Sequence, residues 1–182
     1  MTAEATLVAK LIACGLDPSG ISVRYQEHLQ SDVITLSPAA GASETKFECI
    51  YKAARGSFVE FDDKVLGSEY SAFEEREAGE WMRGEATAWL KAHNQFEGAP
   101  TLLPKQNPEV WARAVEHFCG FQPGEAIEFV EPTLMTLRHS IMTFPSDPRA
   151  DCLMYVIWLS DLKASGIEFG FVGNKAYSDG PK

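Results

Sequence analysis

The chain has 182 residues, of which 45% are hydrophobic and 23% are charged, a balance typical of a folded globular protein and not of a disordered one. Its 26 acidic residues outnumber its 16 basic ones and give a net charge of −10, which disfavours binding to nucleic-acid phosphates. No apolar run approaches the roughly 18 residues that a membrane-spanning helix needs, and the N-terminus lacks the basic stretch of a signal peptide.

The four cysteines, which show no Cys-x-x-Cys spacing, are Cys14, Cys49, Cys119 and Cys152. We expect all four to be free thiols, because neither a zinc site nor a disulfide framework has this spacing and three of them stand among apolar residues. Free thiols are typical of a reducing compartment, so we expect a cytoplasmic protein of bacterial type.

The N-terminal part of the chain, residues 1–96, predicts an α-β-β-α-β unit followed by a long helix. Segments with helical spacing of apolar residues are interspersed with segments in which apolar and polar residues alternate. The expected elements are a helix from Ala3 to Cys14, strands over 21–26 and 33–36, a helix that Ser43 opens and Gly56 closes, and a strand over 57–61.

The segment from Ser68 to Phe96 predicts a long amphipathic helix, with the Ser68 hydroxyl as its N-cap. Gly79 and Gly84 each cost roughly 1 kcal/mol relative to alanine in a helix interior. They therefore indicate close packing against another element, or a bend.

Glu85 lies on the apolar stripe of this helix, with Trp81 one turn before it and Trp89 one turn after it. In one interpretation the helix rolls or breaks at Gly84 and leaves the carboxylate at the solvent-exposed rim. In the other, the carboxylate lies in an aromatic pocket that Trp111 of the next helix closes, where it binds an ammonium group of a ligand. The expected ligand-binding residues are Trp81, Glu85, Trp89 and Trp111.

Residues 97–106 include two prolines and are the expected linker, either between two lobes or within one continuous domain. The remaining part, residues 107–182, predicts a helix followed by antiparallel strands. Asn107-Pro108-Glu109 is a strong helix start, since an N-cap precedes a proline and an acid. The expected strands are 127–130, 134–144, 152–159 and 167–172.

The spacing in 134–144 fits a strand and a helix alike. The continuous apolar run 152–159 predicts a central strand that is covered on both faces. We detect no internal repeat in the sequence.

The sequence contains none of the common motifs for nucleotide binding, zinc proteases or α/β-hydrolases. His93, His117 and Cys119 lack the spacing of a metal site, so we expect no metal and no cofactor. His139 lies on a predicted strand and is expected to be a buried structural histidine. A run of acidic residues forms a solvated face or a docking site for a basic partner, and its members are Glu74, Glu75, Glu77 and Glu80.

Together these features predict an α+β protein in which helices pack on a largely antiparallel sheet, in one domain or two lobes. The leading hypothesis is a soluble, acidic, cytoplasmic binding or regulatory protein that engages a protein partner or a small ligand and is not a catalyst. We expect neither a nucleic acid nor a membrane as its partner. The alternative is a small-molecule hydrolase or transferase built around Glu85 and His139, and a weaker one is an acidic inhibitor that mimics DNA. An enzyme should show convergent titratable groups in its deepest cleft, whereas an interaction protein should show an exposed apolar patch.

Overall fold

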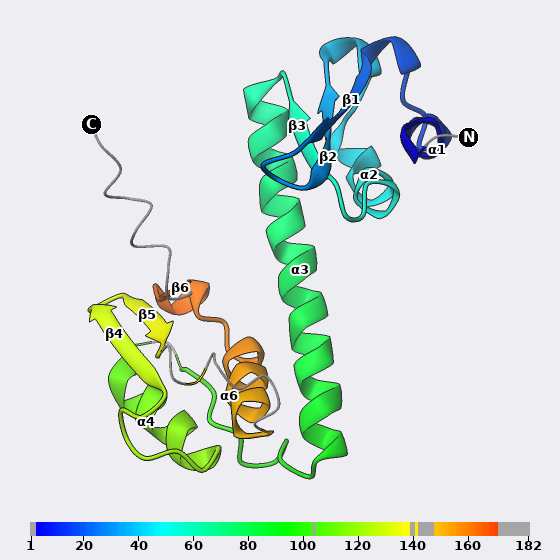
Figure 1. Cartoon of the computed structure of the whole chain (residues 1–182). Helices are drawn as coiled ribbons and strands as arrows, with labels where there is room; N and C mark the ends of the chain where they lie inside the picture. Colours follow the sequence, from blue (N-terminus) through cyan, green and yellow to red (C-terminus); the bar gives the residue numbers. More distant parts are fainter. Residues whose placement is uncertain (1–2, 104, 139–140, 142–147, 171–182) are drawn as a thin grey trace. The chain divides into compact units, whose positions relative to one another are not determined.

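Five α-helices and two three-stranded sheets make up the part of the chain that the computed structural model describes (Figure 1). The described part is the whole chain except residues 1–2, 104, 139–140, 142–147 and 171–182. The α+β class is confirmed. Each sheet is mixed and joins one antiparallel pair of strands to one parallel pair. Within the described ranges, no helix combines the length and the apolar character needed to cross a membrane.

The contacts divide the chain into two compact units, residues 1–78 and 79–182. Unit 1 contains α1 (Ala3–Ala13), β1 (Ile21–Gln26), β2 (Ser31–Leu36), α2 (Phe47–Ala53), β3 (Phe58–Phe61) and the first part of α3 (Lys64–Ala92). Strand β2 is central, antiparallel to β1 and parallel to β3. Helices α1 and α2 pack against each other and share one apolar core with the sheet, which includes Leu11, Leu16, Ile34, Leu36 and Ile50.

The long helix α3 begins earlier than the sequence predicted, at Lys64 instead of Ser68. The carboxylate of Asp63 accepts hydrogen bonds from the backbone N–H groups of Val65 at 2.9 Å and Leu66 at 3.2 Å. Asp63 is therefore the residue that caps the helix, and the predicted cap at Ser68 is wrong. The helix continues without interruption through Gly84, so the break that one interpretation of Glu85 allowed does not occur, and Glu85 is exposed on an unbroken helix.

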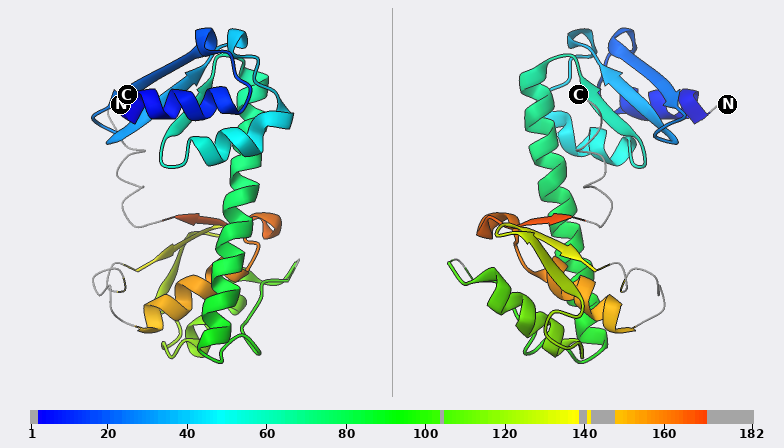
Figure 2. Two further views of the ribbon diagram at one scale, coloured as in Figure 1. Left: turned by 90° about the vertical axis from the view of Figure 1, so that its right-hand side faces the viewer. Right: turned by 60° about the vertical axis from the view of Figure 1, so that its left-hand side comes forward.

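Unit 2 contains the last part of α3, α4 (Pro108–Phe118), β4 (Ile127–Glu131), β5 (Leu134–Leu137), α6 (Pro148–Leu159) and β6 (Glu168–Gly170). Strand β5 is central, antiparallel to β4 and parallel to β6. Helices α4 and α6 both lie below the sheet in the views of Figures 1 and 2. The predicted start of α4 is confirmed, because the Asn107 side chain accepts from the N–H groups of Glu109 at 2.9 Å and Val110 at 3.4 Å.

The segment predicted as a central strand over 152–159 is instead the greater part of helix α6. A continuous apolar run does not distinguish a buried strand from a buried helix, because every position is apolar in both. The features that decide for a helix lie just before the run, where Pro148 takes the first helical position and Asp151 lies in the first turn. The open segment 134–144 begins as strand β5, and most of its second half, with His139, lies outside the described residues.

The two units repeat one topology, contrary to the expectation that the chain has no internal repeat. Each runs helix, antiparallel hairpin, helix, parallel third strand, with the second strand in the centre. The first helix of each ends in the pattern Cys-Gly-apolar-x-Pro, at residues 14–18 and 119–123. Gly15 and Gly120 both take the left-handed conformation, with φ of 79° and 82°. This short pattern is too weak a sequence signal to reveal the repeat without the structure.

Both units also carry the same disulfide, so the prediction of four free thiols is wrong. Cys14, just after α1, bonds to Cys49 in α2, and Cys119, just after α4, bonds to Cys152 in α6. The bonded residues are 35 and 33 positions apart in sequence, yet their Cα atoms are 5.6 and 5.7 Å apart. Sequence spacing missed these pairs because the packing of two helices brings the partners together. The chain-entropy model assigns a loop of this length roughly 3–4 kcal/mol of stabilisation.

Candidate functional site

Five aromatic side chains of unit 2 form a continuous line, which we call the aromatic row. Trp81 and Trp89 come from α3, His93 directly follows the last residue of α3, and Tyr155 and Trp158 come from α6. The backbone N–H of His93 still donates to the oxygen of Trp89 at 3.1 Å, so the side chains of these two residues, four positions apart, project from the same side. Trp81 lies eight residues before Trp89 on α3. Tyr155 and Trp158, three residues apart on α6, likewise project from one side.

The ring centroids follow one another at contact distances along the row. Trp81 lies 6.4 Å from Trp158, which lies 5.3 Å from Tyr155 with the two rings nearly perpendicular. Tyr155 stacks on Trp89 at 4.8 Å, and Trp89 stacks on His93 at 3.8 Å. The His93 ring is also held by a hydrogen bond from its Nδ1 to the backbone oxygen of Trp89, at 2.8 Å.

Much of the aromatic row faces solvent. Trp81 is 55% exposed and His93 is exposed, while Trp89, Tyr155 and Trp158 are half-buried. Large aromatic side chains usually bury most of their area, so an exposed indole in contact with a second one is an unusual feature of a surface.

The structure brings together part of the ligand site that the sequence predicted. Trp81 and Trp89 are connected through Trp158 and Tyr155 of α6, and Glu85 lies exposed between them on α3. Trp111 does not close a pocket over Glu85. It is 1% exposed in the core of unit 2, where its indole N–H donates to the backbone oxygen of Pro100 at 3.2 Å.

Sequence reasoning missed Tyr155 and Trp158 because it assigned their segment to a strand. Their spacing of three residues was the available signal, since it places two aromatic side chains on one helical face. The alternative catalytic pair of Glu85 and His139 stays a prediction, because His139 lies outside the described residues.

Glu116 of α4 is a second notable group, since it is fully buried. Burial alone would raise the pKa of its carboxyl group, but the N–H groups of Gly124, Ile127 and Ala126 and the Arg113 guanidinium donate to it and hold that pKa below its ordinary value. A carboxylate with all its acceptor sites occupied is a structural group that fixes the segment between α4 and β4.

Tyr70 of α3 lies in the aromatic core of unit 1, with its ring centroid 5.1 Å from those of Phe47 and Phe61. Its hydroxyl is buried and, within the described part of the chain, has no partner at good hydrogen-bond geometry, although the Glu74 carboxylate lies close enough for a weak interaction. Burial raises the pKa of this phenol, and the charge of Glu74 raises it further. Burial also raises the pKa of the Glu74 carboxyl group.

Two shallow depressions are present on the described surface. One, of about 320 Å³, is lined by Lys91, Asn94, Phe96 and Glu97. The other, of about 520 Å³, is lined by Lys163, Gly166, Ile167, Glu168 and Phe169. No group of three His, Cys, Asp or Glu side chains among the described residues is placed to hold a metal ion.

No protein family, curated protein or solved structure matches this chain. Indole and phenol rings with exposed faces bind apolar groups and cations, and the imidazole of His93 is the group of the row that commonly serves as a general base in other proteins.

Proposed function

We propose that this protein is a non-catalytic binding protein that engages a protein partner through the aromatic row of unit 2. The observation that supports the proposal is the contact of exposed Trp81 with Trp158, at the open end of a line of five aromatic side chains. Tryptophan and tyrosine are the residues most enriched where alanine substitution costs most binding energy, because they combine a large apolar area with few rotatable bonds.

The charge around the row favours a partner segment rich in arginine or lysine. Glu85 is exposed between Trp81 and Trp89, and the chain as a whole has a net charge of −10. A guanidinium group stacked on an indole gains roughly 0.5–2 kcal/mol, and a nearby carboxylate adds a charge-assisted hydrogen bond. Electrostatic attraction from an acidic protein also accelerates the approach of a basic segment.

A protein partner fits this surface better than a small ligand does. A small-molecule site encloses most of its ligand, whereas both depressions are open and neither has Trp81, Trp89 or Trp158 in its lining. Their linings include lysine and glutamate side chains but no histidine or cysteine. The exposed aromatic surface is the outcome expected for an interaction protein.

Isothermal titration calorimetry of the whole protein with an arginine-rich peptide tests the proposal, and a glutamate-rich peptide of the same length serves as the ligand control. We expect the wild type to bind only the basic peptide. Trp81→Ala should weaken binding at least about tenfold, which corresponds to about 1.4 kcal/mol. Glu85→Gln should weaken it less and should reduce its dependence on salt.

The matched protein control is Tyr25→Ala, which removes an aromatic side chain that is 62% exposed on β1 of unit 1. This variant should bind like the wild type. Equal losses for Tyr25→Ala and Trp81→Ala would refute a role specific to the row. A wild type that does not bind the basic peptide would refute the choice of partner.

The cellular location is a separate part of the proposal. The sequence predicted a cytoplasmic protein, but that prediction depended on free thiols. We propose an oxidising compartment instead, because both disulfides would be reduced by the glutathione and thioredoxin systems of a typical cytosol. Mass spectrometry of protein alkylated during lysis of the native host would show whether the four cysteines are bonded in the cell.

A further inference from the structure

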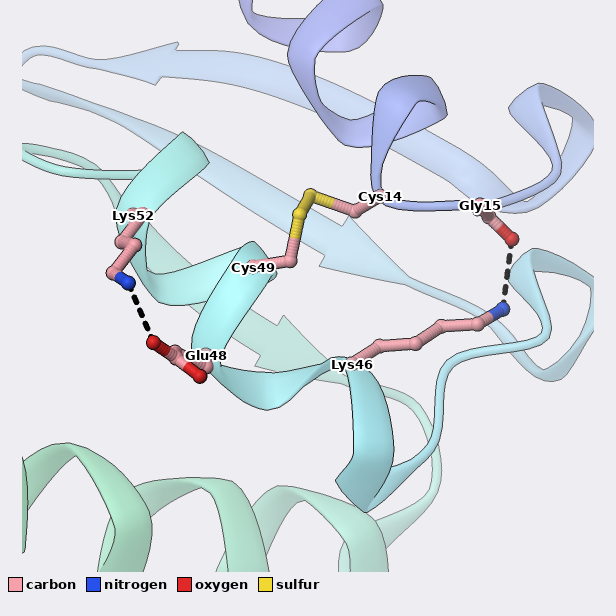
Figure 3. Close-up of a disulfide and its surroundings, with 6 residues drawn as sticks. All are labelled: Cys14, Gly15, Lys46, Glu48, Cys49 and Lys52. Carbon is pink, nitrogen blue, oxygen red and sulfur yellow. Dashed lines mark hydrogen bonds and ion pairs between the residues drawn. A yellow bond between two sulfur atoms is a disulfide. The ribbon is translucent and has the colours of Figure 1, made fainter.

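The two disulfides occupy equivalent places in the repeated topology but differ in access to solvent. Cys119 is 5% exposed and Cys152 is 2% exposed, and both belong to the apolar core of unit 2. In unit 1, Cys49 is exposed and Cys14 is half-buried. Figure 3 shows this bond between the turn after α1 and helix α2.

We propose that the Cys14–Cys49 disulfide is a site of thiol–disulfide exchange with low-molecular-weight thiols, and that the equivalent Cys119–Cys152 disulfide is not. Exchange requires a thiolate to reach a sulfur atom along the line of the S–S bond, so its rate depends on access. The exposed residue, Cys49, is the one that an incoming thiolate meets first.

The reaction balances without any further reagent. A thiolate attacks Sγ of Cys49, the bond to Cys14 breaks, and Sγ of Cys14 leaves as a thiolate that takes a proton from water. Cys49 is then joined to the thiol as a mixed disulfide. A second thiolate attacks the sulfur of the bound thiol, so that Cys49 leaves and is protonated. Two thiols have then been oxidised to one disulfide, and the two cysteines have been reduced.

Unit 1 retains other links between the two segments when this bond opens. The Lys46 ammonium group, just before α2, donates to the backbone oxygen of Gly15 at 2.7 Å (Figure 3). The same group also donates to the backbone oxygen of Gly41 at 2.7 Å. The apolar contacts between the helices remain as well, since Leu11 of α1 and Ile50 of α2 are both 0% exposed. The reduced cysteines therefore stay close to each other, and the exchange is reversible.

The test treats the folded wild-type protein with reduced glutathione, quenches samples with an alkylating agent and maps the cysteines by peptide mass spectrometry. We expect alkylated Cys14 and a glutathione adduct on Cys49 to appear at least about tenfold faster than any opening of Cys119–Cys152. Circular dichroism of the same samples should show a folded protein throughout. Removal of glutathione under air should restore the Cys14–Cys49 bond.

Two single variants sharpen the test. Cys14→Ser leaves Cys49 without a resolving partner, so the folded variant should accumulate a stable adduct with oxidised glutathione. Cys119→Ser is the matched control, in which Cys152 should form no adduct while the protein is folded. Opening of both wild-type disulfides at equal rates, preferential opening of Cys119–Cys152, or resistance of both would overturn the proposal.

Discussion

The buried carboxylate of Glu116 provides the sharpest prediction about stability. Its Oε1 accepts from the N–H groups of Ala126 at 2.8 Å and Ile127 at 2.7 Å, and its Oε2 accepts from Gly124 at 2.7 Å and from Arg113. Ala126 and Ile127 are both 0% exposed, so water cannot replace the carboxylate as their acceptor.

Leucine is the substitution to test at position 116, because Leu11 holds the equivalent place in unit 1. The backbone oxygen of Leu11 accepts from the N–H of Leu16, as that of Glu116 accepts from Phe121. Glu116→Leu would fill the volume and leave two buried donors unpaired, at about 1–3 kcal/mol each. We expect a total loss of roughly 3–5 kcal/mol, as for the loss of one partner from a buried ion pair.

Glu116→Gln should cost less, because its amide oxygen still accepts from Ala126 and Ile127. Its NH₂ group would then face the donors of Gly124 and Arg113. Urea denaturation at neutral pH measures both losses. Glu131→Gln, which changes an exposed carboxylate on β4, is the control and should stay within about 0.5 kcal/mol of the wild type.

The pH dependence of the stability follows from the direction in which folding shifts the pKa of Glu116. The pKa of Glu116 is lower in the folded protein than in the unfolded chain, so its stabilisation is complete above the unfolded value of about 4.3. It is lost as the pH falls through the folded pKa. The difference in the free energy of unfolding between the wild type and Glu116→Gln should therefore shrink as the pH falls from the unfolded pKa through the folded pKa. Equal unfolding midpoints at neutral pH, or a difference that does not change in acid, would refute the reasoning.

Two further predictions concern α3. Asp63→Ala should lower the free energy of unfolding by about 1 kcal/mol through loss of the N-cap, whereas Ser68→Ala should leave it nearly unchanged, and denaturant unfolding of both variants distinguishes the two cap positions. Tyr70→Phe should be neutral or should stabilise the protein by up to about 1 kcal/mol, because it removes a buried hydroxyl whose interaction with Glu74 lacks good hydrogen-bond geometry. A loss of more than about 1 kcal/mol in thermal unfolding would indicate a strong hydrogen bond to Glu74.

Local signals were predicted well from the sequence, and contacts between distant segments were not. The start of α4 depends on three consecutive residues, Asn107-Pro108-Glu109, and the structure has it where the sequence placed it. The start of α3 was wrong because Ser68 was taken as the cap in place of Asp63, although an aspartate before a helix is as good a cap as a serine.

To predict the whole aromatic row, residues 152–159 had to be assigned to a helix, and the periodicity of a continuous apolar run does not distinguish a helix from a strand. Helical spacing on α3 correctly placed Trp81 and Trp89 on one face, but their partners lie on α6, which the apolar run disguised as a strand. Trp111 was misplaced for a related reason. Its helix was right, but which neighbour that helix packs on is a tertiary property, and the indole faces the core instead of Glu85.

The repeated disulfides give the chain an unusual covalent topology. Each bond closes a ring that runs from the residue after the first helix through the hairpin into the second helix, and α3 lies outside both rings. A protease that cuts the turn between β1 and β2, or the one between β4 and β5, therefore leaves every fragment attached. Only a cut between Cys49 and Cys119 separates the two halves of the molecule. Limited proteolysis on gels run without and with reductant would consequently give different patterns for cuts inside the rings and the same pattern for cuts between them.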